Sequence, residues 1–146
     1  MEGVIKILLC GAAILALPLI HPFGDVRGKR SAEALKGVDP LIVRACQNCH
    51  SERTEWPAYS YLPFVSWAIE KDVAEAREHL DFSRWDRYST DEKKDLLAQI
   101  GAVVRNRQMP LPRYLLLHPE ARLTDQEVQT IYEWSKNQRH ALRSGE

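Results

Sequence analysis

One pentapeptide constrains this chain more than any other stretch: Cys46-Gln47-Asn48-Cys49-His50. It has the form C-x-x-C-H, the attachment signature of a c-type haem. Positions three apart on a helix share a face, so Cys46 and Cys49 project together and can reach the two vinyl groups on one porphyrin edge. His50 follows directly and is placed to ligate the iron from one side. The motif therefore predicts one covalently bound haem c with His50 as its proximal ligand.

Two other chemistries use a pair of cysteines at this spacing, and the rest of the sequence disfavours both. A structural zinc site needs two more ligands in a recognisable cluster, and the chain has no second C-x-x-C. A thioredoxin-like redox pair normally follows a strand of a β-α-β unit, whereas no segment here alternates like a strand. Cys10 is the third cysteine, and an odd number argues against a disulfide framework.

The chain beyond the motif is patterned for helices. Asp39-Pro40 is typical of a helix start, and this first helix carries the motif at its C-terminal end. Apolar spacing and two capping boxes, which begin at Ser89 and Thr124, predict further helices over residues 64–80, 89–108 and 125–141. The expected fold class is all-α, a cytochrome c-like bundle of about four helices around a covalent haem, preceded by an N-terminal hydrophobic helix.

The first 23 residues have the composition of a signal or anchor segment. Residues 7–20 contain no charged side chain, a length between a signal-peptide core and a comfortable membrane span. No cleavage site of the A-x-A type follows closely, which favours an uncleaved anchor over a cleaved signal. Residues 24–38, which contain three glycines, are interpreted as a linker, and residues 39–146 as the haem domain. The expected location is the periplasmic side of the bacterial inner membrane, or the periplasm if the segment is cleaved.

A low-spin haem iron takes a second axial ligand, usually methionine or histidine. Met109, which Pro110 follows, is the predicted distal ligand because Met1, the only other methionine, lies at the membrane end. His79 and His118 are the alternatives.

Several side chains are candidates for the haem surroundings. Trp56 and Trp85 lie in irregular segments near the motif and are predicted to pack against the haem, although ordinary core packing explains them equally well. Arg53 and Arg113 are candidate partners for a haem propionate, although a solvated surface position is the more usual one for an arginine. The Pro63 carbonyl is expected to accept the Nδ1 proton of His50, since such bonds orient metal-bound histidines.

Longer stretches of the chain resemble a known family. The segments CQNCHSERTEWPAYSYLPFVSWAIEKDV, HLDFSRW and QMPLPRYLLLHPEARLT occur in this order. Over about residues 39–135 the pattern resembles the small bacterial "haem-binding domain" proteins, a monohaem cytochrome c-like group. The resemblance implies a haem on Cys46 and Cys49, His50 as proximal ligand and an N-terminal hydrophobic anchor. The Met-Pro step is also similar to the distal-ligand step of ordinary cytochromes c, which supports Met109.

These features predict an electron carrier rather than an enzyme. An iron with two protein ligands has no open site, so its natural work is one-electron exchange with redox partner proteins. The alternative is a haem-based small-ligand sensor or minor peroxidase, in which Met109 dissociates to open the sixth position. A haem-carrying module of a larger assembly is a third possibility. The formal net charge is zero and no basic run occurs, so no nucleic-acid partner is expected.

Overall fold

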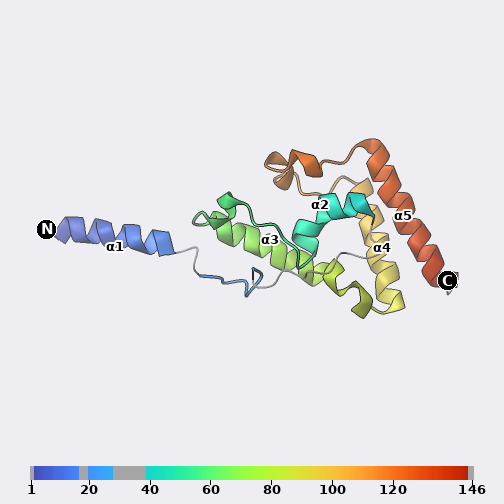
Figure 1. The fold of residues 1–146 in the computed structure, drawn as a ribbon, viewed down its shortest axis with the longest axis horizontal. Helices are drawn as coiled ribbons and strands as arrows, with labels where there is room; N and C mark the ends of the chain where they lie inside the picture. The colour runs from blue at the N-terminus through green and yellow to red at the C-terminus, as the bar shows by residue number, and fades with distance from the viewer. Residues whose placement is uncertain (1, 17–19, 28–38, 145–146) are drawn as a thin grey trace.

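The computed structural model describes residues 2–16, 20–27 and 39–144 (Figure 1). All regular structure in these ranges is helical, which confirms the all-α class. The α-helices are α1 (Glu2–Ala16), α2 (Pro40–His50), α3 (Val65–His79), α4 (Thr90–Arg105) and α5 (Asp125–Ser144). Short 3-10 helices connect them: η2 (Ala58–Tyr61), η3 (Phe82–Arg87), η4 (Tyr114–Leu116) and η5 (Pro119–Ala121).

The predicted helix starts are present as hydrogen-bonded caps. The Asp39 side chain accepts a 2.8 Å hydrogen bond from the backbone N–H two residues on, at the start of α2. At the start of α4, Ser89 and Glu92 form a complete capping box. Thr124 and Glu127 exchange the same pair of bonds before α5, at 2.8 and 3.2 Å. Each cap satisfies N–H groups that a helix start leaves without a partner, so local sequence fixes these boundaries.

Helix α4 ends at Arg105, earlier than the predicted end at Gln108. Arg107 adopts a left-handed φ of 58°, and its N–H bonds to the carbonyl three residues back at 3.0 Å. The Gln108 N–H reaches back to the Val103 carbonyl at 2.9 Å. This pair of bonds is a Schellman closure, which usually has glycine at the left-handed position. It turns the chain sharply and places Met109 at the start of the following loop.

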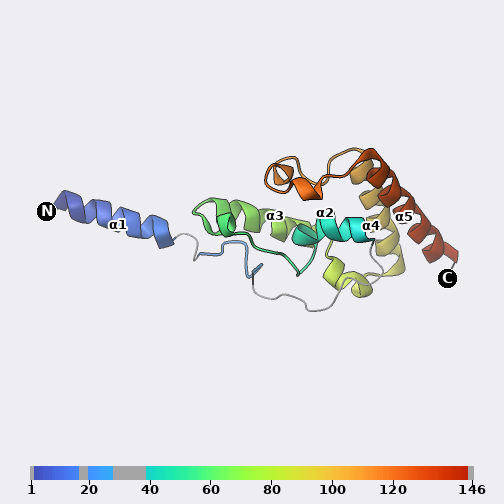
Figure 2. The same cartoon turned by 45° about the horizontal axis from the view of Figure 1, so that its top comes forward.

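The core lies where α4 and α5 pack side by side, with α2 against them (Figures 1 and 2). Gly101 on α4 permits this approach, because a Cβ there would lie 2.7 Å from the Ser135 hydroxyl oxygen on α5. The most deeply buried apolar side chains come from α2, α3, α4 and α5: Ile42, Val73, Leu97, Val104 and Ile131. Helix α2 is thus held by its apolar first half, which leaves its C-terminal half to present the motif.

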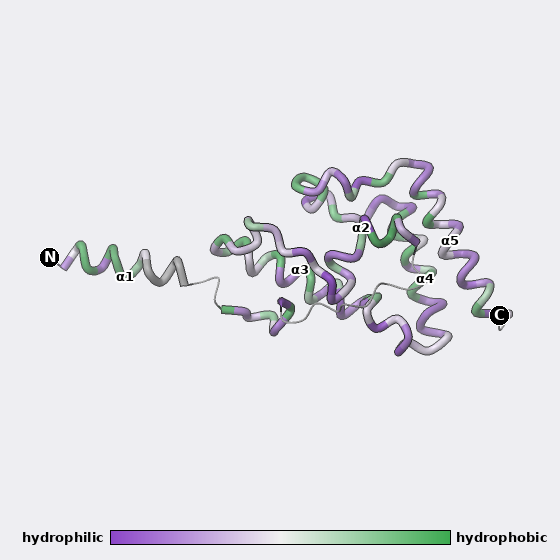
Figure 3. Tube along the Cα trace, viewed as in Figure 1, coloured by the Kyte–Doolittle hydropathy of each residue, from purple (hydrophilic) through white to green (hydrophobic). Residues whose placement is uncertain are grey.

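The N-terminal residues extend in a different direction from the bundle. Helix α1 points away from the other helices in both views, and Figure 3 shows its hydrophobic colouring. The side chains of Val4, Ile7 and Leu9 are exposed. No helix within residues 2–16, 20–27 and 39–144 is both long and apolar enough to cross a membrane.

Residues 20–27, which we call the strap, lie along α3. The Trp67 indole N–H donates to the Ile20 carbonyl at 2.8 Å, and Arg77 donates to the Val26 carbonyl at 2.9 Å. Residues 24–27 are the part of the predicted linker that the structure describes, and residues 28–38 lie outside the described ranges.

Candidate functional site

His50 ends helix α2 with its imidazole held in one orientation. Its Nδ1 lies 3.0 Å from the Leu80 carbonyl oxygen. A carbonyl only accepts, so Nδ1 carries the proton and Nε2 keeps its lone pair. Burial is the main cause that lowers the pKa of His50, which favours the neutral ring. Both effects prepare Nε2 to ligate a metal ion.

The prediction that the Pro63 carbonyl accepts this proton was wrong. Pro63 precedes the N-terminal end of α3, whereas Leu80 follows the C-terminal end of the same helix. Helix α3 packs against α2 so that its C-terminal end meets His50. Leu80 is itself buried in the core, which fixes the position of its carbonyl.

Cys46 and Cys49 are free, half-buried cysteines one turn apart on α2. Burial, with a smaller contribution from Cys49, raises the pKa of Cys46 to about 12. Burial followed by the charge of Asp72 raises the pKa of Cys49 to about 11, against the lowering effects of Arg77 and Arg113. Both groups are therefore neutral thiols near pH 7, unlike the low-pKa thiolates of redox-active pairs.

Among the residues that the structure describes, no group of three or more His, Cys, Asp or Glu side chains is arranged to hold a metal ion. A structural zinc site needs four such ligands.

Two charged side chains, Asp72 and Arg113, lie near Cys49 and influence its pKa. Arg113, just before η4, makes two hydrogen bonds to the Asp72 carboxylate on α3, at 3.1 and 2.6 Å. Such paired bonds between arginine and a carboxylate fix orientation as well as distance. The Asp72–Arg113 pair thus connects α3 to the loop after α4.

An aromatic network ties the 3-10 helices to the motif. The Asn48 amide donates to the Tyr114 hydroxyl at 3.0 Å, and the Tyr114 ring stacks on His118 with centroids 4.2 Å apart. His118 Nε2 lies 2.5 Å from the Tyr59 hydroxyl, and its Nδ1 lies 2.9 Å from the Glu120 carboxylate. Both nitrogens of His118 therefore have protein partners. Asn48 and Tyr114 were not among the predicted site residues, although the four-residue spacing between Tyr114 and His118 is a signal for their contact.

The backbone that leaves the motif is held by Arg77 from α3. The guanidinium donates to the Ser51 carbonyl and to the Thr54 hydroxyl, both at 2.9 Å. Thr54 in turn donates to the Asn48 carbonyl at 2.6 Å. A cation suits this place because the last carbonyls of a helix have no partners within the helix. Burial lowers the pKa of Arg77, against the raising effect of Asp81.

The structure places the candidate distal ligands in different surroundings. Met109 is half-buried directly after the α4 closure. His79 is exposed on the last turn of α3, next to Leu80, whose carbonyl holds the Nδ1 side of His50. His79 therefore lies on the Nδ1 side of the imidazole, away from the free Nε2, and both nitrogens of His118 have protein partners.

The two tryptophans predicted to contact haem both have protein partners. The Arg27 guanidinium lies over the Trp56 ring at 4.1 Å from its centroid. Trp85 packs against Phe82 and Tyr88, with ring centroids 6.1 and 6.0 Å apart. Trp85 also borders the hydrophobic core.

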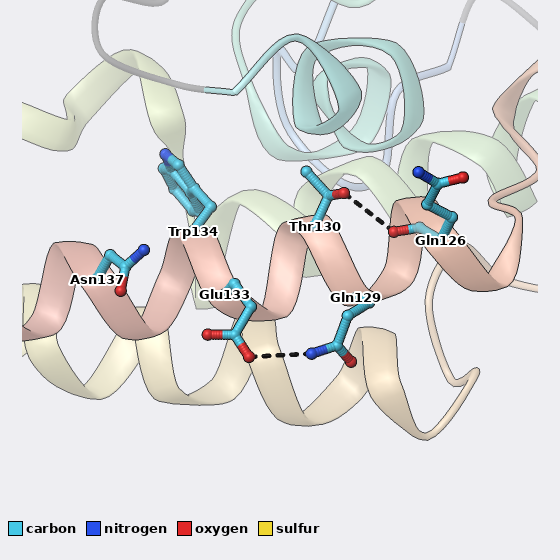
Figure 4. A pocket seen from close by; sticks show the side chains of 6 residues that line it. All are labelled: Gln126, Gln129, Thr130, Glu133, Trp134 and Asn137. Atoms are coloured by element: carbon cyan, nitrogen blue, oxygen red, sulfur yellow. Dashed lines mark hydrogen bonds between the residues drawn. The ribbon is translucent and has the colours of Figure 1, made fainter.

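A hollow lies beside α5 and is lined by Gln126, Gln129, Thr130, Glu133, Trp134 and Asn137 (Figure 4). Its lining residues bond mainly within the helix: Gln129 donates to Glu133 at 2.9 Å, and Thr130 donates to the Gln126 carbonyl at 3.0 Å. None of its residues belongs to the motif or to the candidate iron ligands.

Comparison with known proteins identifies a family for this chain. A sequence model described as "Haem-binding domain" matches residues 25–137. The chain is similar to the cytochrome c peroxidase Ccp of Escherichia coli (strain K12), with 26% identity over 118 residues. The match covers 79% of this chain and 25% of that relative, so the chain spans a quarter of the relative's length. No solved structure matches.

Proposed function

This chain belongs to the haem-binding domain family, as its motifs predicted, and we propose that it is a monohaem c-type cytochrome that exchanges single electrons. Cys46 and Cys49 bond to the vinyl groups of one haem, and His50 is the proximal ligand. The observation that carries the proposal is the 3.0 Å contact between His50 Nδ1 and the Leu80 carbonyl. It leaves Nε2 free at the end of the helix from which both cysteines project.

The surroundings of the motif suit a porphyrin. When bound, the haem supplies a one-electron iron couple whose potential depends on its ligands and on burial. Val65 lies two turns before Asp72 on the same face of α3, and Leu116 and Leu117 are exposed on the facing loop. These apolar side chains are available to cover the ring, while Arg113 offers a cation for a propionate.

We assign the distal position to Met109. His118 is a weaker candidate because each of its nitrogens has a protein partner. His79 is weaker because it adjoins the carbonyl that holds the other side of His50. Methionine and histidine together give a six-coordinate iron, which favours electron transfer over substrate binding.

A minor peroxidase, or a sensor of small ligands, is the second candidate function. The similarity to a cytochrome c peroxidase favours it. It requires that Met109 leave the iron, so that peroxide or a diatomic gas takes the sixth position. The two functions differ in whether the reduced protein binds carbon monoxide.

The N-terminal segment supports a proposal for the location of the protein. Residues 7–20 lack charge, and the side chains described in this part of α1 are exposed. We propose that this segment attaches the protein to the periplasmic side of the inner membrane. There the haem domain exchanges electrons with redox partner proteins.

Haem attachment is tested on denaturing gels stained for haem. The wild-type chain is expected to keep its haem, and Cys46→Ala and Cys49→Ala are each expected to weaken the stained band, with loss in the double variant. Cys10→Ala is the matched control and keeps the stain. A double variant that retains the stain contradicts thioether attachment.

Ligation is tested by absorption spectra of the oxidised and reduced protein. Methionine–ferric iron gives a weak red band, which Met109→Ala is expected to abolish. His79→Ala and His118→Ala serve as controls that keep it. If the wild-type protein lacks the band and its reduced form binds carbon monoxide, the simple carrier is refuted and the second function is favoured.

A further inference from the structure

Five exposed apolar side chains gather on two segments at one end of the fold. We call this set the apical patch: Ile20, Phe23, Tyr61, Leu62 and Phe64. Phe64 is 62% exposed, Ile20 is 55% exposed and Leu62 is 53% exposed. Contiguous exposed apolar groups of this kind mark contact surfaces in soluble domains.

The two segments are joined by Trp67 on the first turn of α3. Its indole donates to the Ile20 carbonyl at 2.8 Å, and its ring packs edge-on against Phe64 at 6.1 Å. Arg27, further along the strap, lies over the Tyr61 ring at 4.6 Å and donates to Glu70 at 2.5 Å. Glu70 is fully buried. The strap is therefore docked, and the patch has a fixed position relative to the bundle.

Phe64 and Val65 lie on different sides of the start of α3. Val65 shares a helix face with Asp72, which pairs with Arg113. Phe64 instead packs with Trp67, on the side that the strap occupies. The patch residue Phe64 is therefore on another side of α3 from the side that we propose to cover the haem.

Chain connectivity places the patch next to the N-terminal apolar segment. Helix α1 ends at Ala16, and the four residues from there to Ile20 span at most about 14 Å. Ile20 is both the last residue of the uncharged segment 7–20 and a member of the patch. Figures 1 and 2 show the end of α1 and the start of α3 at the same end of the fold.

We infer that the apical patch inserts into the headgroup region of a phospholipid bilayer and fixes the orientation of the haem domain on the membrane. The inference rests on the membrane attachment proposed above. If residues 7–20 attach the chain to the membrane, then Ile20, the last of them, lies at the lipid surface. Tyrosine and tryptophan favour this interface, where one part of the ring is apolar and the other is hydrated. The α4–α5 pair then points toward the aqueous side.

The experiment uses the full-length, haem-loaded chain on vesicles of phosphatidylethanolamine and phosphatidylglycerol. In a Cys10→Ser background, Leu62→Cys and Phe64→Cys each carry one nitroxide label. Ala102→Cys on α4 is the matched control, an exposed apolar position outside the patch, and Gln129→Cys is a polar control on α5. Electron paramagnetic resonance measures the access of a water-soluble nickel chelate and of oxygen to each label. Circular dichroism verifies that each variant is folded.

Vesicles are expected to lower chelate access about threefold at Leu62 and Phe64, as for groups about 5–10 Å deep in the interface, and to leave the controls unchanged. If the patch labels are as accessible as the Ala102 label while the chain still floats with vesicles, the inference is overturned and the vesicle attachment stands. A chain that does not float with vesicles overturns both. The Cys10→Ser parent has no cysteine outside the motif, so any nitroxide that it incorporates reports motif thiols that carry no haem. Failure of haem attachment is therefore recognised separately. The signal of the labelled parent is subtracted from that of each variant.

Discussion

Replacing Arg77 by Met tests whether one side chain holds the backbone that leaves the haem motif. The variant keeps an apolar stem of similar length but removes three hydrogen bonds, to Ser51, Thr54 and Val26. Ser51 is fully buried, so its carbonyl loses its strongest donor in a place that water does not reach. An unsatisfied buried polar group costs about 1–3 kcal/mol. With the loss of charge-assisted bonds, we expect destabilisation of about 2–4 kcal/mol.

Urea unfolding of the full-length chain, followed by circular dichroism, measures this difference. Lys71→Met is the matched control on the same helix, because Lys71 and its partner Glu75 are both 56% exposed and their charged atoms lie 3.6 Å apart. Exposed pairs contribute about 0–1 kcal/mol, so the control is expected to change the free energy of unfolding little. If Arg77→Met and Lys71→Met are equally stable, the three bonds contribute nothing net and the reasoning is refuted.

Three further predictions concern the bundle. Leu97→Ala removes a fully buried side chain and is expected to cost about 2–5 kcal/mol in urea unfolding, against about 0.5 kcal/mol or less for exposed Leu117→Ala. Gly101→Ala puts a methyl group 2.7 Å from the Ser135 hydroxyl and is expected to destabilise by about 1–3 kcal/mol. Combining it with Ser135→Gly should restore most of the loss, and a purely additive double variant contradicts the clash. Hydrogen bonding to the Ser89 backbone lowers the pKa of Glu92, so its stabilisation is complete above the unfolded-state pKa and is lost as pH falls through the lower folded-state pKa. Glu92→Gln should therefore flatten the acid side of the stability profile, and an unchanged profile contradicts the role of this cap.

The helix starts were predictable because their causes are local. Ser89 and Glu92 are three residues apart and satisfy each other's backbone groups wherever the rest of the chain lies. The motif is equally local, since its chemistry requires only the spacing of two thiols and an imidazole. The early end of α4 was not predictable, because Arg107 takes a left-handed position that usually requires glycine.

The partners of the motif were not predictable because they depend on how helices pack. Pro63 was chosen for its closeness in sequence, whereas the direction of α3 decides that Leu80 reaches His50. The bonds of Arg77 join segments 23 to 51 residues apart. Polar contacts at such separations leave no periodic pattern in the sequence, unlike the apolar face of an amphipathic helix.

The strap shows why composition is a poor guide to where this domain begins. Glycine content placed residues 24–38 in a linker, but the family match begins at residue 25. Arg27 reaches the buried Glu70 carboxylate, and the Val26 carbonyl accepts from Arg77. A buried carboxylate without a cation is strongly unfavourable, so the fold needs the strap as a charge partner rather than as a spacer. The same Arg77 holds the backbone behind the motif, and therefore one side chain connects the N-terminal segment to the Cys46–His50 motif.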